Sequence, residues 1–477
     1  MSWQSKIYHK YRFNEKGVKI VSDYTGLLIH ASFLHFLDEE KKPYSVVQTI
    51  PEILKKLNSN ELIILGKSLS IPTFINNQSE VFNFNFSDLP INGSAEILSG
   101  ISVEKIISLL EYLDENQPHF VISVYNLQNI LEVSNEYAAR KSLNSLNCKI
   151  QSNFNKPLSI ENVISIAQEW SVLQYNSYQL NNTEYLGLIN QIDNYCNSYF
   201  IDGTWQEAFF AQASNPKTID KILNKLKFDK APQKALLCFD CMGLPEWLLL
   251  KNFLNDLNLT FEESPVFSLI PSITSIARSA IFAGTYDVYE KKNPGQAIEE
   301  IDFKEFFGIE NTLYLKEKDF TDTDLLIGYN TVSILFNFFD DLSHSTLLQE
   351  NNPTKFSYFN ASNDYLKNSR VKQIIKDLLE QGFTIYICSD HGSTIACGNG
   401  NRVDKYLIDK FAKRATIISK DSAVLTEYKK VSIPFIENKL VIIPENREMF
   451  ANRNQYEINH GGITIEEMVV PFIKIIK

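Results

Sequence analysis

Along residues 18–66, short apolar runs alternate with stretches whose apolar positions recur at helical spacing. Short apolar runs of this kind are typical of buried strands, and their alternation with helices is the rhythm of a βαβαβ unit. The pattern predicts strands at 18–21, 44–48 and 61–65, with helices at 25–37 and 51–57 between them. We therefore predict a small, parallel α/β domain over residues 1–97.

Residues 98–230 follow a helical pattern instead. Within 103–110 the apolar positions fall at three- and four-residue intervals, which is the spacing of an amphipathic helix. Ser159 precedes Ile160-Glu161-Asn162 as an N-cap residue precedes a helix. The region carries no recognisable catalytic constellation, and we interpret its His119 as structural. We predict a helical region that links two α/β domains.

Residues 231–477 return to apolar runs separated by helical segments. The runs that we interpret as buried strands are 234–239, 313–315, 332–339, 383–389, 415–419 and 439–443. This pattern predicts an α/β domain with a doubly wound, mostly parallel sheet and helices on both faces. Ligands of such sheets bind outside the carboxyl ends of the strands. Polar residues that directly follow the runs are therefore the first candidates for a functional site.

Composition supports a globular protein with more than one domain. The chain has 477 residues, of which 44% are hydrophobic and 22% charged, as in ordinary globular proteins. Its net charge of −11 argues against a surface that grips nucleic acid through many lysines and arginines. The charge does not exclude a phosphate-bearing substrate, because divalent ions in a cleft supply local positive charge.

The sequence predicts no membrane segment and a cytoplasmic location. No apolar run approaches the ~18–20 residues that span a bilayer, and no signal-peptide core follows the polar residues 1–6. The six cysteines are dispersed, so we expect reduced thiols. Cys238 and Cys241 form a CxxC, but no second pair stands at zinc-ribbon spacing, and we interpret the pair as chance.

Acidic residues and a histidine follow two of the predicted strands. Asp240 comes directly after 235–239, although a lone aspartate at this position is more often a helix cap. Asp340 and His344 follow 332–339 and stand at i and i+4, so they face the same way on a helix. Carboxylate oxygen and imidazole nitrogen together suit a divalent ion of borderline softness. A charged helix start is the alternative reading of this pair.

Two further histidines stand in glycine-containing turns. The strand 383–389 ends in Asp390-His391-Gly392, where the glycine makes a turn plausible from which both neighbours can reach one ion. His460 lies in Asn459-His460-Gly461-Gly462, ahead of a helical segment. All three histidines beyond His119 thus fall in candidate site motifs.

A candidate nucleophile stands in Pro271-Ser272-Ile273-Thr274. Thr274 would begin a helix that ends at Gly284, and its hydroxyl would lie at the positive end of the helix dipole, which favours a phosphate or an alkoxide. Arg278, one turn later, could reach the same phosphate with a bidentate fork. The alternative is that Ser272 or Thr274 merely caps the helix.

With these motifs in place, the carboxyl-terminal half resembles the PglZ domain family of the alkaline-phosphatase superfamily. The shared landmarks, in the family's order, are Phe239-Asp240-Cys241-Met242-Gly243, Pro271-Ser272-Ile273-Thr274 with Ala277-Arg278, Asn337-Phe338-Phe339-Asp340 with Ser343-His344, Ser389-Asp390-His391-Gly392, and His460-Gly461-Gly462 with 466–471.

The resemblance implies a centre with two divalent metal ions, zinc in preference to manganese. It assigns Asp340, His344 and His460 to one ion, and Asp240, Asp390 and His391 to the other, with Thr274 between them as the nucleophile. A metal-bound threonine is activated for attack on phosphorus, and two ions can stabilise both the attacking and the leaving oxygen.

The resemblance implies a phosphodiesterase or phosphatase that acts on a nucleotide or oligonucleotide, in a phage-defence system of the BREX type with partner proteins. Thr274 argues against a sulfatase, which needs cysteine or serine at that position. A phosphomutase and the choice between monoester and diester stay open, as does the oligomeric state. The alternative function is a non-catalytic or weakly catalytic PglZ interaction module in a defence or signalling assembly. Asp23 is isolated, which disfavours a phosphorylation pocket in the leading domain.

Overall fold

The computed structural model describes residues 1–59, 61–66, 69–289, 296–348, 353–401, 412–420, 428–433 and 436–476. The chain forms two compact units, Met1–Asn144 and Ser145–Lys477, which we describe separately. Helix α6 (Leu127–Asn153) extends across the limit between them. The predicted three-part division, with limits near residues 97 and 230, stays a prediction.

The first unit is built on a four-stranded parallel sheet with the order β2-β3-β1-β4. The predicted strands and helices of 18–66 are all present, and β4 adds one further strand to the sheet. The elements of this unit are α1 (Trp3–Lys10), β1 (Lys19–Asp23), α2 (Ala31–Glu39), β2 (Tyr44–Val47), α3 (Ile50–Lys56), β3 (Leu62–Leu65), α4 (Thr73–Asn76), β4 (Glu80–Phe84), β5 (Asn92–Gly93), α5 (Val103–Asn116) and β6 (Val121–Ile122).

Asp23 organises the loop that follows β1. Its Oδ1 accepts hydrogen bonds from the backbone of Thr25 and Gly26, and its Oδ2 accepts one from Leu28 at 2.8 Å. These bonds hold the start of the predicted helix 25–37 as a loop, so that α2 begins only at Ala31. The carboxylate of Asp23 is thus used structurally, as its isolation in the sequence indicated.

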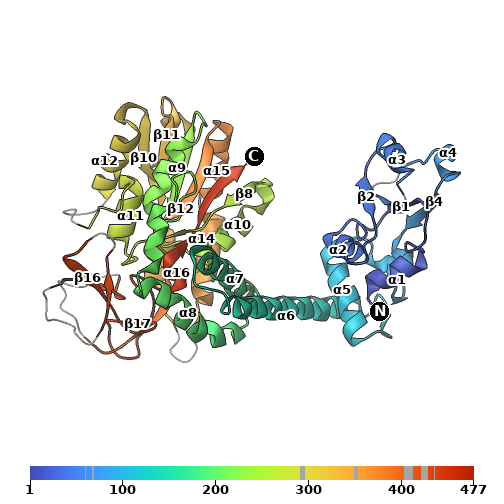
Figure 1. The fold of residues 1–477 in the computed structure, drawn as a ribbon, viewed down its shortest axis with the longest axis horizontal. Helices are drawn as coiled ribbons and strands as arrows, with labels where there is room; N and C mark the ends of the chain where they lie inside the picture. Colours follow the sequence, from blue (N-terminus) through green and yellow to red (C-terminus); the bar gives the residue numbers. More distant parts are fainter. Residues whose placement is uncertain are drawn as a thin grey trace. The chain divides into compact units, whose positions relative to one another are not determined.

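The second unit is built on a six-stranded sheet with the order β10-β11-β7-β12-β20-β8 (Figure 1). Strands β10, β11, β7 and β12 are parallel, and β20 is antiparallel to both of its neighbours. This confirms the predicted mostly parallel α/β sheet. Its strands are β7 (Lys234–Phe239), β8 (Thr260–Glu263), β10 (Thr312–Lys316), β11 (Thr331–Phe336), β12 (Thr384–Ser389) and β20 (Phe472–Ile476).

Helices cover both faces of this sheet. One face packs its alternate side chains, such as Leu237, Ile334 and Ile387, against α10, α14 and α15 in one hydrophobic core. On the other face α11 and α12 pack together, and α12 contacts β10 (Figure 1). The helices of the unit are α7 (Ile160–Gln179), α8 (Ile189–Ile201), α9 (Ile222–Phe228), α10 (Leu244–Phe253), α11 (Thr274–Ala283), α12 (Gln296–Phe307), α13 (Phe338–Ser345), α14 (Phe356–Asn368), α15 (Val371–Glu380) and α16 (Ile465–Met468).

The remaining strands form small sheets beside the main one. They are β9 (Val266–Phe267), β13 (Thr394–Gly398), β14 (Thr416–Ser419), β15 (Lys429–Ser432), β16 (Lys439–Ile443), β17 (Glu448–Met449), β18 (Tyr456–Asn459) and β19 (Val469–Val470). The predicted strands 415–419 and 439–443 are real, but they pair antiparallel in the sheet β14-β16-β15, not in the main sheet. Their apolar pattern predicts burial, which does not specify a pairing partner.

Two other predictions concern where single elements begin and end. Ser159 caps α7, because its side chain accepts from the backbone of Asn162 at 3.2 Å, as predicted. The predicted strand 332–339 ends at Phe336, and its last residues already belong to α13. Over the described residues, no helix combines the length and the apolar character that crossing a membrane requires.

Candidate metal centre

The carboxyl ends of two neighbouring parallel strands bring two aspartates together. Strands β7 and β12 pair in register from Lys234 to Phe239, with Phe239 opposite Ser389. Asp240 and Asp390 are the next residues of each strand, so both carboxylates emerge at the same edge of the sheet. The structure gathers Asp240, Asp390 and His391 into one buried group in which one ligand atom of each lies within 4.8 Å of the others.

A second group combines the helix after β11 with the turn after β18. Asp340 and His344 lie one turn apart on α13, with 3.1 Å between Asp340 Oδ1 and His344 Nε2. His460 Nε2 is 3.6 Å from the same oxygen. Ligand atoms of the three residues again lie within 4.8 Å of one another. The i, i+4 spacing that predicted a shared face is therefore realised on a helix.

Strand pairing places the two groups side by side. Strand β13 begins shortly after His391 and pairs with β18, which ends just before His460, with Thr394 opposite Asn459. The imidazole rings of His391 and His460 stack with 4.1 Å between their centroids. Each group offers carboxylate oxygen and imidazole nitrogen, and the two groups are neighbours in the way that a two-ion centre requires.

Backbone carbonyls fix which nitrogen of two histidines faces the centre. His391 Nδ1 lies 3.1 Å from Gly392 O, and His460 Nδ1 lies 3.2 Å from Ser272 O. A proton on each Nδ1, donated to the carbonyl, leaves the lone pair of Nε2 for a ligand. This is the arrangement that orients metal-binding histidines.

Buried atoms without hydrogen bonds show that the residues fit metal ions. Within the part of the chain that the structure describes, Asp240 Oδ1, Asp390 Oδ2 and His460 Nε2 are buried and have no hydrogen-bond partner. The other carboxylate oxygen of Asp390 accepts from the backbone N–H groups of Cys241 and His391 at 3.1 and 2.9 Å. Because unpartnered buried acceptors are costly, these atoms are well suited to bind cations.

The protonation of the groups depends on their burial. Burial raises the pKa of Asp240 well above its usual range, and the charge of Asp390 acts in the same direction. Burial also raises the pKa of Asp390 to about 6, and together with the charge of His391 it lowers the pKa of His460 well below its usual range. Burial acts to raise the pKa of Asp340, but the hydrogen bond with His344 and the charges of His460, His344 and His391 together outweigh it and lower the value to about 2. Crowded carboxylates that cannot all ionise in a buried site are a setting that a divalent cation stabilises.

Thr274 reaches the first group from the start of α11. It is the first residue of that helix, and its Oγ1 lies 2.9 Å from His391 Nε2. Because His391 Nδ1 faces a carbonyl, the threonine hydroxyl donates to Nε2. The hydroxyl thus lies beside the ligand atoms and at the positive end of a helix dipole, as the sequence predicted.

Arg278 binds carboxylates. Its Nη1 donates to Asp240 Oδ2, and its Nε donates to Glu299 Oε1 at 2.9 Å. A fork to a phosphate through Nη1 and Nε would require breaking both ion pairs. In this structure Arg278 supports the candidate ligand Asp240, and its predicted contact with a phosphate stays a prediction. Glu299 lies on α12 and accepts a further hydrogen bond from Tyr314.

Several residues that hold the centre escaped the sequence reasoning. Glu299 and Arg414 have no local signal, because their partners lie far away in the chain. Cys241 contributes its backbone N–H to Asp390 and adopts a positive φ of 62°, whereas its thiol had been the feature of interest. Glu467 stands three residues after Thr464, which is a capping-box spacing that could have revealed it.

A polar cavity of about 590 Å³ adjoins the second group. His344 is among its lining residues, so the cavity opens directly beside a candidate ligand. Cationic and amide side chains make up half of the other lining residues, beside Thr346, Leu347, Leu348, Tyr456 and the acidic Glu457. The cationic and amide residues are Lys413, Asn452, Arg453, Asn454 and Gln455.

A match to a family model covers nearly all of the residues in which the sequence predicted the second α/β domain. A model of the BREX system PglZ alkaline phosphatase-like domain matches residues 218–475. Murine ectonucleotide pyrophosphatase/phosphodiesterase 5 is similar at 14% identity, with 51% of this chain and 87% of that chain covered and a TM-score of 0.32. Phosphonoacetate hydrolase from Sinorhizobium meliloti 1021 is similar at 12% identity, with 51% and 90% covered and a TM-score of 0.29. At these TM-scores neither structure bears on the substrate, and no curated protein matches the chain.

Proposed function

The chain belongs to the PglZ family of alkaline-phosphatase-like domains, and from this premise we propose that it hydrolyses phosphoric esters with two bound divalent ions. Asp340, His344 and His460 would hold one ion, and Asp240, Asp390 and His391 the other. Zinc suits this mixture of imidazole and carboxylate, and manganese is the alternative. The observation that carries the proposal is that the rings of His391 and His460 stack, so that the two groups adjoin, with the Thr274 hydroxyl 2.9 Å from His391 Nε2.

Thr274 is the nucleophile of the proposed reaction. Bound divalent ions would supply positive charge that lowers the pKa of the hydroxyl and offsets the charge of the phosphate oxygens. The Thr274 oxygen attacks phosphorus, the bond from phosphorus to the leaving ester oxygen breaks, and water then hydrolyses the phosphothreonine. The start of α11 favours the anionic phosphate, because the helix dipole is positive there. The Thr274 oxygen lies 2.9 Å from His391 Nε2, so it stands beside an atom that would hold an ion.

The cavity beside His344 supports a substrate that is larger than a phosphate group. Its volume of about 590 Å³ lies within the range of pockets that hold an entire small ligand, roughly 300–1,000 Å³. Arg453 would attract an anion, whereas Lys413 is paired with Glu457 of the same wall, and the amide side chains offer both donors and acceptors. This lining favours a phosphodiester with a polar substituent, such as a nucleotide or a short oligonucleotide.

The matched family description connects the domain with BREX systems. We extend the proposal to a role in such a phage-defence system, in the cytoplasm and together with partner proteins of that system. A Thr274→Ala substitution in the intact defence locus should then abolish protection against phage in a plaque assay. Undiminished protection would separate the defence role from hydrolysis and favour the interaction module.

Metal analysis of the purified protein, combined with a screen of phosphate monoesters and diesters, tests the enzyme directly. Wild-type protein should hold two divalent ions and hydrolyse a nitrophenyl phosphodiester. Asp390→Asn and His460→Asn should lower metal content and turnover together, because each removes an atom that binds an ion. Full metal content and full activity in either variant would refute the assignment of that ligand. Two bound ions without turnover on any ester would support a non-catalytic module.

A further inference from the structure

The turns that follow three of the candidate ligand motifs meet at the short helix α16. The backbone N–H of Gly392, next to His391, donates to Glu467 O at 3.1 Å. The N–H of Gly462, which follows His460 and Gly461, donates to Glu467 Oε1 at 2.8 Å. A Cβ on Gly243, which follows the motif of Asp240, would lie 3.4 Å from Glu466 O. Residues that neighbour both metal groups therefore pack against the same turn of α16.

The Glu467 carboxylate is fully enclosed by hydrogen bonds. Oε1 accepts from Gly462 N and from Arg414 Nε, the latter at 2.8 Å. Oε2 accepts from the backbone and hydroxyl of Thr464 at 2.9 and 2.7 Å, and from Arg414 Nη2 at 3.2 Å. The guanidinium also donates to the carbonyls of Asn446 and Glu448. Both Arg414 and Glu467 are 0% exposed.

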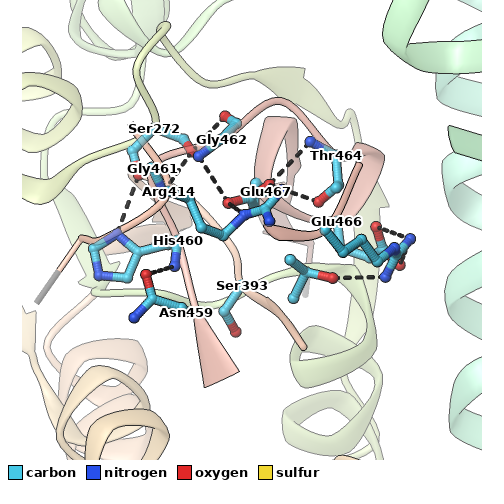
Figure 2. Close-up of polar contacts among 12 residues, drawn as sticks. Ser272, Ser393, Arg414, Asn459, His460, Gly461, Gly462, Thr464, Glu466 and Glu467 are labelled. Atoms are coloured by element: carbon cyan, nitrogen blue, oxygen red, sulfur yellow. Dashed lines mark hydrogen bonds and ion pairs between the residues drawn. The ribbon is translucent and has the colours of Figure 1, made fainter. Parts of the chain in front are cut away.

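This ion pair lies directly against the loop that carries His460 (Figure 2). A Cβ on Gly462 would lie only 2.7 Å from Arg414 Nη2 and 2.8 Å from Glu467 Oε2. Gly461 has a φ of +109°, which side chains rarely allow. The ion pair therefore leaves no room for a side chain at position 462, in the loop that follows His460.

Ser272 connects the same loop to the helix of the nucleophile (Figure 2). Its hydroxyl donates to Gly462 O at 2.9 Å and accepts from Gly461 N at 3.1 Å. Its carbonyl faces His460 Nδ1 at 3.2 Å, and Thr274 follows two residues later. The position of His460 and the start of α11 are therefore set by one buried network.

We propose that Arg414 and Glu467 are positioning residues that aim His460 at its metal ion, with Ser272 as the link to Thr274. The proposal rests on the two-ion function proposed above. Every hydrogen bond of the Glu467 carboxylate goes to Arg414 or to a residue of the turn after His460. Partners that orient metal ligands change metal affinity by about 10–100-fold when removed.

The neighbouring Glu466 provides a matched control. Its carboxylate is also buried, but it accepts from Trp170, Gln174 and Arg447, of which the first two lie on α7. Arg447 in turn binds Asp193 on α8. Glu466 therefore ties helices to the sheet domain without a side-chain bond to the His460 loop. Losing it should lower stability and leave the metal ligands in place.

The experiment compares Glu467→Gln, Arg414→Lys and Glu466→Gln with wild type in full-length protein. Each protein is stripped with a chelator and titrated with Co²⁺, with visible absorption and thermal unfolding as readouts. His344→Asn identifies which absorption and affinity belong to the ion near His460. Glu467→Gln and Arg414→Lys should each lower the affinity for that same ion by about 10–100-fold and leave the affinity for the other ion unchanged. Glu466→Gln should unfold at a lower temperature with both affinities unchanged.

Wild-type affinity for both ions in Glu467→Gln would overturn the inference, as would an equal loss in Glu466→Gln. If Glu467→Gln does not fold, Ser272→Ala replaces it, because it removes only the hydroxyl bonds to Gly461 and Gly462. This variant should lower the affinity for the same ion by about tenfold, and an unchanged affinity would count against the inference. Wild-type protein that binds no divalent ion would instead refute the proposed function itself.

Discussion

At the scale of single residues, four of the six candidate ligands are held so that one atom faces the centre. Asp390 uses one carboxylate oxygen for backbone N–H groups and keeps the other for the site. Two histidines are oriented through Nδ1, and Asp240 is held by Arg278. Such support lowers the cost of ordering ligands when an ion binds.

Replacing Arg278 tests this support. Arg278→Ala would leave Glu299, which is 1% exposed, as a buried carboxylate without its cation. We expect the free energy of unfolding of the metal-free protein to fall by about 3–5 kcal/mol, measured by urea denaturation. Arg140→Ala, which removes an exposed pair with Glu136, should cost less than about 1 kcal/mol. Equal stability of Arg278→Ala and wild type would show that the pair does not hold the site.

The sequence predicted the candidate ligands better than the residues that support them. Ligands announce themselves locally, because Asp340 and His344 share a helix face and Asp390 precedes a histidine and a glycine. Arg278 was placed correctly on α11, but its partners Asp240 and Glu299 come from other elements. The role of a charged side chain depends on what the fold packs against it, which one sequence does not reveal.

At the scale of elements, the centre is made by strand ends and the turns that follow them. The parallel register of β7 and β12 brings Asp240 and Asp390 to one edge, and the β13–β18 pair brings His391 to His460. The sequence predicted β7, β10, β11 and β12 of the main sheet within a residue or a few, but it did not predict β8 and β20. It also placed 415–419 and 439–443 in that sheet, because hydrophobic periodicity reports burial without naming the neighbouring strand.

Close packing of the turn after His391 can be tested with one methyl group. A Cβ on Gly392 would lie 2.1 Å from the backbone oxygen of Glu466, so Gly392→Ala must displace the turn. We expect kcat for a nitrophenyl phosphodiester to fall by about 100-fold, because small misplacements of reacting groups cost this much. Gly187→Ala is the control, since a Cβ there meets nothing within 4 Å. Unchanged kcat in Gly392→Ala would mean that the turn adapts without moving His391.

At the scale of the whole molecule, the two compact units have separate hydrophobic cores. The buried residues of the core around the main sheet lie between Ala235 and Ile475 in the sequence, and the partly buried residues packed against them begin at Tyr175. The two cores of the first unit end at Leu131. All candidate ligands and Thr274 belong to the second unit. We therefore expect the chemistry of the proposed centre to need only the second unit.

A shortened chain tests this separation. A protein of residues 127–477, which keeps α6 whole, should fold cooperatively, bind two divalent ions and hydrolyse a nitrophenyl phosphodiester at close to the full-length rate. The clusters around the main sheet and around Ile442 contain no residue before Tyr175, and in the fragment Leu127, Ile130 and Leu131 of α6 lose their packing against the first unit. Loss of metal binding in a folded fragment would show that the first unit contributes to the centre.

The most direct test of the central claim is the Thr274→Ala protein loaded with zinc. The substitution removes the hydroxyl that lies 2.9 Å from His391 Nε2 and leaves all six carboxylate and imidazole ligands. We expect the variant to bind two zinc ions and its kcat/KM for a nitrophenyl phosphodiester to fall about 1,000-fold or more. Hydrolysis at the wild-type rate by this zinc-loaded variant would show that Thr274 is not the nucleophile.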